Sequence, residues 1–191
     1  MPSPPSPVLP GSRVRGLDGH HLAGREQRVK ELRRYRAAAL PGQALGFDEP
    51  QGEVATDGMP CEDAYAPERT LRPEVGPLGA QRDCIVAERN FCPLGVLCGI
   101  ARRGAFLVIR HPASNVVGPP PGPRRGVGHD AKGQALYEQA VWLTEPETGL
   151  TLVVRRITGQ WRTPTRDGET ELHILTNLQV TEVAAALSSA L

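Results

Sequence analysis

The chain lacks the features that mark membrane, secreted or strongly charged proteins. No apolar run approaches the roughly 18 residues that a membrane-spanning helix needs. Basic and acidic residues nearly cancel to a net charge of +1, so any affinity for nucleic acid would have to come from a local patch. The amino-terminal residues have neither the basic region nor the apolar core of a signal peptide. We therefore expect a cytoplasmic protein that has no membrane contact.

Cysteine and aromatic residues are also scarce. Aromatic side chains make up 4% of the chain, which limits how much of a core they can anchor. The cysteines contain no Cys-x-x-Cys pair, and we predict reduced thiols that pack as small apolar side chains. These are Cys61, Cys84, Cys92 and Cys98. The histidines do not cluster with them, so we interpret the histidines as structural or solvated rather than as zinc ligands.

Proline and glycine, by contrast, are abundant, with 19 and 21 residues, and this predicts many turns and irregular segments. Residues 1–11 are rich in proline and serine and are predicted to be a disordered lead-in. Residues 114–133 are rich in glycine and proline, and we predict a loop throughout this stretch. Residues 59–69 read as a loop followed by a helical turn.

The remaining apolar patterns divide the chain into an α/β part and a later all-β part. In the α/β part we predict helices at 21–39 and 91–103, and strands at 12–18, 44–47, 52–57, 83–87 and 105–110. In the later part we predict a hairpin turn at 145–149, a turn at 164–168, the start of a helix at 181–191, and strands at 135–143, 150–157 and 171–177.

Two of the predicted strands end in an acid. The run Cys-Ile-Val-Ala at residues 84–87 is followed by Glu88, and Asp18 ends the first strand. Open α/β sheets place their chemistry at the carboxyl ends of strands, so we expect Asp18 and Glu88 to hold metal ions together. The alternatives are structural: Asp-Gly is a common turn, and Glu88 could cap the helix that follows it.

Several segments, in order, resemble one family of enzymes. Residues 14–23 resemble its Leu-Asp-Gly-Asn-His-Leu segment, and residues 85–92 resemble its Ile-Ala-Asp-Arg-Asn-Phe-Cys segment. Further similar segments are residues 99–106, 163–171 and 175–178. From Ser12 onward the chain thus resembles the DDE transposases of bacterial insertion sequences, in the insertion-sequence-four family.

This resemblance implies an α/β fold in which an RNase H-like mixed sheet with helices is interrupted by a β-strand insertion. Residues 12–112 would form part of the catalytic core, 113–178 the loop and β-strand insertion, and 179–191 the start of a truncated helix. In the family, two aspartates and a glutamate bind Mg²⁺ or Mn²⁺ for DNA strand cleavage and transfer. Two such ions activate the attacking oxygen and stabilise the leaving one. Asp18 and Glu88 would be the catalytic metal ligands here.

Two departures from the family predict impaired catalysis. Glu88 stands where the family has aspartate, and its side chain is one methylene longer. A displacement of about 1 Å at a reacting centre can cost on the order of a hundredfold in rate. The family's Tyr-x-x-Arg-x-x-x-Glu-x-x-x-x-x-x-Lys signature, which supplies the third acid, is not found in residues 178–191. We therefore expect a truncated transposase whose C-terminal catalytic helix is missing.

The resemblance also implies partners, namely transposon-end DNA and an oligomer formed with full-length transposase. Paired basic residues are the candidates for phosphate contacts, with a solvated surface as the alternative. The candidate DNA-binding residues are Arg33, Arg34, Arg102 and Arg103. Two other hypotheses are a non-catalytic DNA-binding or transposase-inhibiting remnant, and a fragment that does not fold stably because an apolar face is uncovered.

Overall fold

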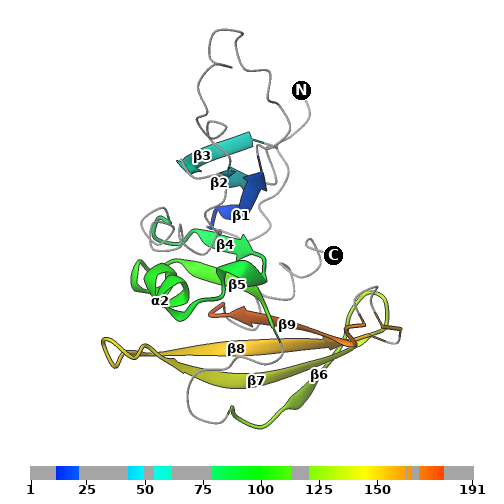
Figure 1. Ribbon diagram of the computed structural model, residues 1–191. Helices are drawn as coiled ribbons and strands as arrows, with labels where there is room; N and C mark the ends of the chain where they lie inside the picture. Colours follow the sequence, from blue (N-terminus) through cyan, green and yellow to red (C-terminus); the bar gives the residue numbers. More distant parts are fainter. Residues whose placement is uncertain are drawn as a thin grey trace, which may run out of the picture.

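Nine strands form one mixed sheet. The computed structural model describes residues 12–21, 43–49, 54–61, 79–112, 121–161, 163–164 and 168–178. Within those residues the strand order is β3-β2-β1-β4-β5-β9-β8-β7-β6 (Figure 1). The predicted α/β class is therefore confirmed. No helix in the described ranges is both long enough and apolar enough to cross a membrane.

The first five strands of the chain form one half of the sheet, with β1 at its centre. They are β1 (Val14–His21), β2 (Gln43–Glu49), β3 (Val54–Cys61), β4 (Cys84–Ala87) and β5 (Phe106–His111). On one side of β1, the strands β2 and β3 form an antiparallel hairpin pair. On the other side, β4 and β5 run parallel to β1. The parallel strands are nearly continuous apolar runs, as expected where both faces of a sheet are covered.

A short crossover joins β4 to β5. It consists of the 3₁₀ helix η4 (Arg89–Phe91) and the helix α2 (Leu94–Arg102), which confirms the helix predicted in this region. Pro93 is the N-cap of α2, so the ring stands just before the first helical turn. Gly104 follows the helix with a φ of +69°, a left-handed conformation that glycine adopts without a Cβ clash.

Aliphatic side chains fill the core on both faces of the sheet. On the α2 face, Leu97 and Ile100 pack with Phe91 against the strands. The buried strand residues on that face include Leu17, Ile85, Ala87, Leu107 and Ile109. The opposite face carries a smaller cluster, which contains Cys84, Val108, Ile157 and Leu178. Cys84 and Cys98 are buried free thiols, in agreement with their predicted role as small apolar side chains.

The second part of the chain is an antiparallel meander. It consists of β6 (Arg125–His129), β7 (Ala135–Thr144), β8 (Thr151–Gln160) and β9 (Glu171–Thr176). The three strands predicted here are confirmed as β7, β8 and β9, and so is the hairpin turn, where the Gly149 N–H donates to the Glu145 carbonyl at 2.8 Å. The meander joins the first part through antiparallel pairing of β9 with β5.

Two predictions of loop were wrong. Residues 125–129 form the edge strand β6, because backbone pairing with β7 holds them although all five residues are exposed. Residues 59–61 belong to β3, where pairing with β2 extends the hairpin beyond its predicted end. The predicted helix at 21–39 lies outside the described residues except for His21, which ends β1. The predictions for residues 1–11, 62–69 and 181–191 also lie outside them.

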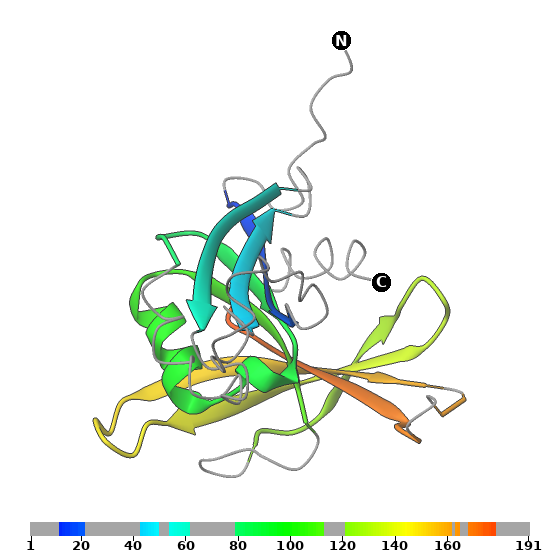
Figure 2. The same cartoon turned by 45° about the horizontal axis from the view of Figure 1, so that its top comes forward.

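The junction between β5 and β9 is reinforced by one side chain. Asn177 follows β9, and its amide nitrogen donates to the Ala105 carbonyl at 3.1 Å. Its amide oxygen accepts from the Leu107 N–H at 2.8 Å. Figure 2 shows the resulting arrangement, in which the long strands β7 and β8 lie beyond β9 and their connecting turn comes near α2.

Candidate functional site

Asp18 and Glu88 lie beside each other. Leu17 pairs with Ala87 across the parallel strands β1 and β4, so the next residue on each strand is an acid. Leu17 and Ala87 belong to the core on the α2 face, and alternation along the strands turns Asp18 and Glu88 to the opposite face. Neighbouring strands are about 4.8 Å apart. The register therefore places the two predicted site residues side by side, with Asp18 inside β1 and Glu88 directly after β4.

Each of these carboxylates already has a local partner. Asp18 is exposed, and its Oδ1 accepts from the Gly19 N–H at 2.8 Å. Both residues lie inside β1, where they pair with Gly46 and Leu45 of β2, so the prediction that the first strand ends at Asp18 was wrong. Glu88 is the N-cap of η4, and its Oε2 accepts from the Arg89 N–H at 3.4 Å. The side chain of Glu88 is 60% exposed. The cap considered as the structural alternative for Glu88 is thus present, whereas the turn considered for Asp18 is not.

Arg110 stands on the other side of Glu88. Ala87 pairs with Ile109 across β4 and β5, so Arg110 follows at the end of β5 on the same face as Glu88. Its Nη1 lies 3.6 Å from Glu88 Oε2. Asp18, Glu88 and Arg110 therefore form a row across three parallel strands, in which the middle acid faces a guanidinium.

A second acid completes the ion pairs at this edge. Glu169 Oε2 lies 2.6 Å from Arg110 Nη2, and Glu169 Oε1 lies 3.1 Å from Arg89 Nη1. We refer to Glu88, Arg89, Arg110 and Glu169 as the strand-end ion cluster. Its members come from the end of β4, from η4, from β5 and from the residues before β9, so the cluster ties the meander to the first part of the sheet.

These residues do not complete a metal site by themselves. Among the described residues, no group of three or more histidine, cysteine or acidic side chains is placed to hold a metal ion. Asp18 and Glu88 are two oxygen donors, and Glu88 is shared with Arg110. Mg²⁺ requires near-octahedral oxygen coordination, and a guanidinium beside one ligand opposes a second positive charge there.

An apolar hollow of about 440 Å³ borders Glu88 and Arg110 on this face. Its walls come from β4, β5 and the meander, and include Val86, Val108, Leu136, Ile157, Leu172 and Ile174. Polar groups of Asp130 and Gln134 lie at its border. The candidate site thus has a charged edge next to an apolar floor.

The candidate DNA-binding residues are distant from this edge or outside the described ranges. Arg102 and Arg103 end α2, before β5 begins, whereas Glu88 follows the end of β4; these are opposite edges of the parallel strands. Arg102 Nη1 lies 2.7 Å from Glu145 Oε2, and this hydrogen bond raises the pKa of Arg102. A hydrogen bond from Thr148, and then the one from Arg102, lower the pKa of Glu145. Arg33 and Arg34 lie outside the described residues.

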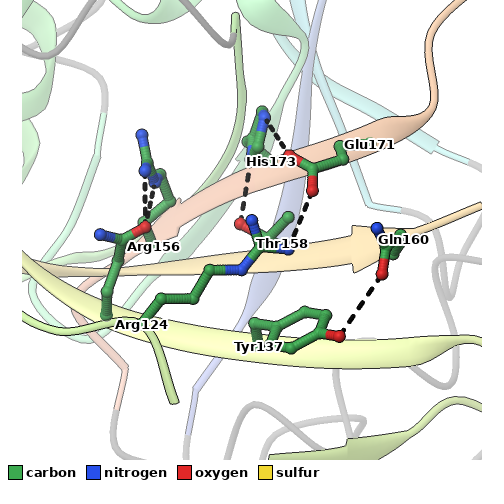
Figure 3. Close-up of polar contacts among 8 residues, drawn as sticks. Arg124, Tyr137, Arg156, Thr158, Gln160, Glu171 and His173 are labelled. Carbon is green, nitrogen blue, oxygen red and sulfur yellow. Dashed lines mark hydrogen bonds and ion pairs between the residues drawn. The ribbon is translucent and has the colours of Figure 1, made fainter. Parts of the chain in front are cut away.

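A buried polar cluster occupies the meander (Figure 3). His173 Nδ1 shares a hydrogen bond with Thr158 Oγ1 at 3.0 Å, and His173 Nε2 lies 3.6 Å from Glu171 Oε2. Arg124 reaches the other Glu171 oxygen at 2.9 Å and stacks 4.1 Å from the centre of the Tyr137 ring. Burial, and then the charge of Arg156, lower the pKa of His173. We interpret this cluster as structural, since Thr158 and His173 are buried.

Comparison with protein-family models and with curated protein sequences gives no match. The assignment of function therefore depends on the geometry and on the segments quoted above.

Sequence reasoning missed the other members of the strand-end ion cluster, which are Arg89, Arg110 and Glu169. Arg110 had a usable signal, because it ends a predicted strand just as Glu88 does, and parallel strand ends gather at one edge. Arg89 directly follows Glu88. Glu169 had no such signal, since it is separated from Arg89 by 80 positions along the chain.

Proposed function

We propose that this protein is a catalytically impaired relative of the DDE transposases, built on an RNase H-like core and related to metal-dependent DNA strand cleavage and transfer. The observation that carries the proposal is the adjacency of Asp18 and Glu88, on one face, where the parallel pairing of β1 with β4 ends. Two carboxylates in that position match the role that the family's first two acids have.

The strand order supports the same proposal. An antiparallel β1–β2–β3 group beside parallel β1, β4 and β5 is the arrangement expected of an RNase H-like core. The meander β6–β9 follows β5 in the chain, which is where the resemblance places its β-strand insertion. The core and the insertion share one sheet through the pairing of β5 with β9.

The reason for the impairment lies at Glu88. Its longer side chain replaces aspartate, and its carboxylate is held by Arg110 at 3.6 Å and by the Arg89 N–H at 3.4 Å. Asp18 and Glu88 would therefore bind Mg²⁺ or Mn²⁺ weakly, and we expect no efficient strand transfer. A shift of about 1 Å in a reacting group can lower a rate on the order of a hundredfold.

The test combines Mn²⁺ binding with a DNA assay. Electron paramagnetic resonance should detect weak Mn²⁺ binding that Asp18→Asn removes and Glu88→Asp strengthens, while the surface variant Glu147→Gln leaves it unchanged. The purified protein, incubated with inverted-repeat DNA and Mg²⁺ or Mn²⁺, should give no strand transfer. Robust strand transfer would contradict the proposed impairment. Mn²⁺ binding that is unchanged in both Asp18→Asn and Glu88→Asp would refute the assignment of the acid pair as metal ligands.

A second candidate function is DNA binding without catalysis, either at transposon ends or in mixed oligomers with a full-length transposase. It is favoured by Arg89 and Arg110, two partly exposed arginines that converge at the strand ends. A gel-shift titration over salt concentration measures it, because binding through phosphates weakens steeply as salt rises. Absence of a shift at low salt would rule it out.

A further inference from the structure

One carboxylate holds two arginines that come from different elements. Arg89 belongs to η4 and Arg110 to β5, and each donates to a separate oxygen of Glu169, at 3.1 and 2.6 Å. Glu169 itself lies two residues before β9. Two guanidinium groups that converge on the oxygens of one anion are arranged as they would be around a phosphate.

We propose that Arg89 and Arg110 form a binding site for a backbone phosphodiester of nucleic acid, and that Glu169 occupies this site as an internal competitor. The inference rests on the proposed DNA-binding function and names the residues that carry it. Its chemistry is the exchange of one anion for another: the Glu169 carboxylate leaves the two guanidinium groups and a phosphate takes its place. No bond is made or broken in this exchange.

The surroundings of the site fit this exchange. The side chains of Arg89, Arg110 and Glu169 are 47%, 31% and 34% exposed, so a nucleic acid backbone can reach them. A hollow of about 260 Å³ beside them provides room for an incoming group, and its walls include His111 and His173. Phosphate contacts of this kind hold the backbone without reading its sequence.

The charges also favour phosphate binding when Glu169 is replaced by Gln. With both acids ionised, the strand-end ion cluster has two positive and two negative side chains. Loss of the Glu169 charge removes the ion pair to Arg89 and leaves Arg110 paired with Glu88, which is 60% exposed and 3.6 Å from Arg110. A phosphate would then restore the balance that Glu169 provided.

The experiment compares Glu169→Gln with a matched variant, Glu147→Gln. Both variants remove one negative charge. Glu147 lies in the exposed β7–β8 turn, at the opposite end of β8 from Glu169, so its replacement leaves the arginine site untouched. Binding to a short DNA duplex is measured by fluorescence anisotropy over a range of salt concentrations. We expect Glu169→Gln to bind about tenfold more tightly at low salt, with a log K against log salt slope steeper by about one, because one more phosphate is contacted.

The arginines provide the second arm. Adding Arg89→Gln and Arg110→Gln to Glu169→Gln should abolish the gain, and circular dichroism melting checks that each variant folds. An equal gain in Glu147→Gln, or a gain that survives loss of both arginines, would overturn the inference.

Inorganic phosphate, titrated separately, distinguishes a general phosphate site from a nucleic acid site. If Glu169→Gln binds phosphate but no variant binds DNA, the anion site stands and the proposed DNA function fails. If the protein binds DNA but Glu169→Gln has no effect, the inference fails and the DNA function stands. If no variant binds phosphate or DNA, both are refuted.

Discussion

His173 is an imidazole whose pKa is lowered in the folded protein. It is buried between β8 and β5, where it shares a hydrogen bond with Thr158 at 3.0 Å. Burial lowers its pKa first, the nearby Arg156 lowers it further, and Glu171 opposes both. An unfolded histidine titrates near pH 6.5, so the unfolded chain takes up a proton at a higher pH than the folded chain does.

This difference predicts a pH-dependent stability. Because the folded pKa of His173 is depressed, its contribution to stability is fully present above about pH 6.5 and is lost as the pH falls below that value. The melting temperature should therefore fall between about pH 7.5 and pH 5, and the fall should be shallower in His173→Gln. The exposed His129 provides the control, and His129→Gln should retain the wild-type slope. Parallel slopes for the wild type and His173→Gln would contradict this account.

Single residues also show which contacts can be predicted from the sequence and which cannot. The rule that parallel strand ends share an edge predicts that Asp18 and Glu88 are neighbours, and the register of β1 with β4 places them side by side, although β1 continues past Asp18 to His21. The buried Arg15 does not follow from any local pattern: it stacks 4.3 Å from the centre of the Phe47 ring, and its guanidinium lies 3.5 Å from Asp83. Such partners are chosen by the tertiary fold, which no window of the sequence contains.

At the scale of elements, the helix α2 is held in place by the apolar side chains that it packs against the sheet. Leu97 is 2% exposed and packs within the main core. Leu97→Ala should lower the free energy of unfolding by about 2–5 kcal/mol, through lost burial and the cavity left behind. Val127, which is 52% exposed in β6, supplies the control, and Val127→Ala should change stability by about 0.5 kcal/mol or less. Urea denaturation measures both, and similar values for the two variants would show that α2 does not anchor the core.

Strands with a regular pattern of apolar residues could be predicted from the sequence, whereas β6, which has no such pattern, was missed. β7 and β8 alternate or run apolar over many residues, and both were predicted. β6 is exposed throughout and contains Gly126 and Gly128 at a register shift, so its sequence resembles a loop. Its strand conformation depends on the neighbouring β7 backbone, and such a bulged, charged edge also discourages pairing with other chains.

At the scale of the whole molecule, we expect the two parts of the sheet to unfold together. Asn177 bonds to the backbone of Leu107 in β5 and of Ala105 just before it, and so continues the pairing of β9 beyond its last residue. Asn177→Ala should cost about 1–3 kcal/mol, because buried backbone groups lose their partner. The exposed Gln160 offers a control, and Gln160→Ala should have an effect of about 0.5 kcal/mol or less.

The two probes for this prediction report on different regions. Both tryptophans, Trp142 and Trp161, lie in the β6–β9 part, so their fluorescence follows that part, while far-ultraviolet circular dichroism follows the whole sheet. Coincident urea transitions are expected. Transitions that separate would show that the junction does not couple the two parts, and the absence of any cooperative transition would favour a chain that does not fold stably.

The succession of strands could be predicted, but their order in the sheet could not. Nothing local in residues 171–176 indicates that this strand adds to β5 rather than closing a separate sheet of its own. The choice depends on side chains such as Leu175 and Val108, which are buried only when both parts are assembled. Pairing across more than 60 positions is a property of the whole chain.

The pairing of His111 with His173 has an evolutionary consequence. The polypeptide leaves the first five strands at the end of β5 and comes back beside the same point, so a tight turn between these two positions would close the gap without moving a neighbouring strand. Everything between them could be gained or lost in a single genetic event. A chain that turned directly from β5 into β9 would keep the backbone pairing of the strands around β1, but it would lose Val141, Leu143 and Val154, which β7 and β8 contribute to the main core.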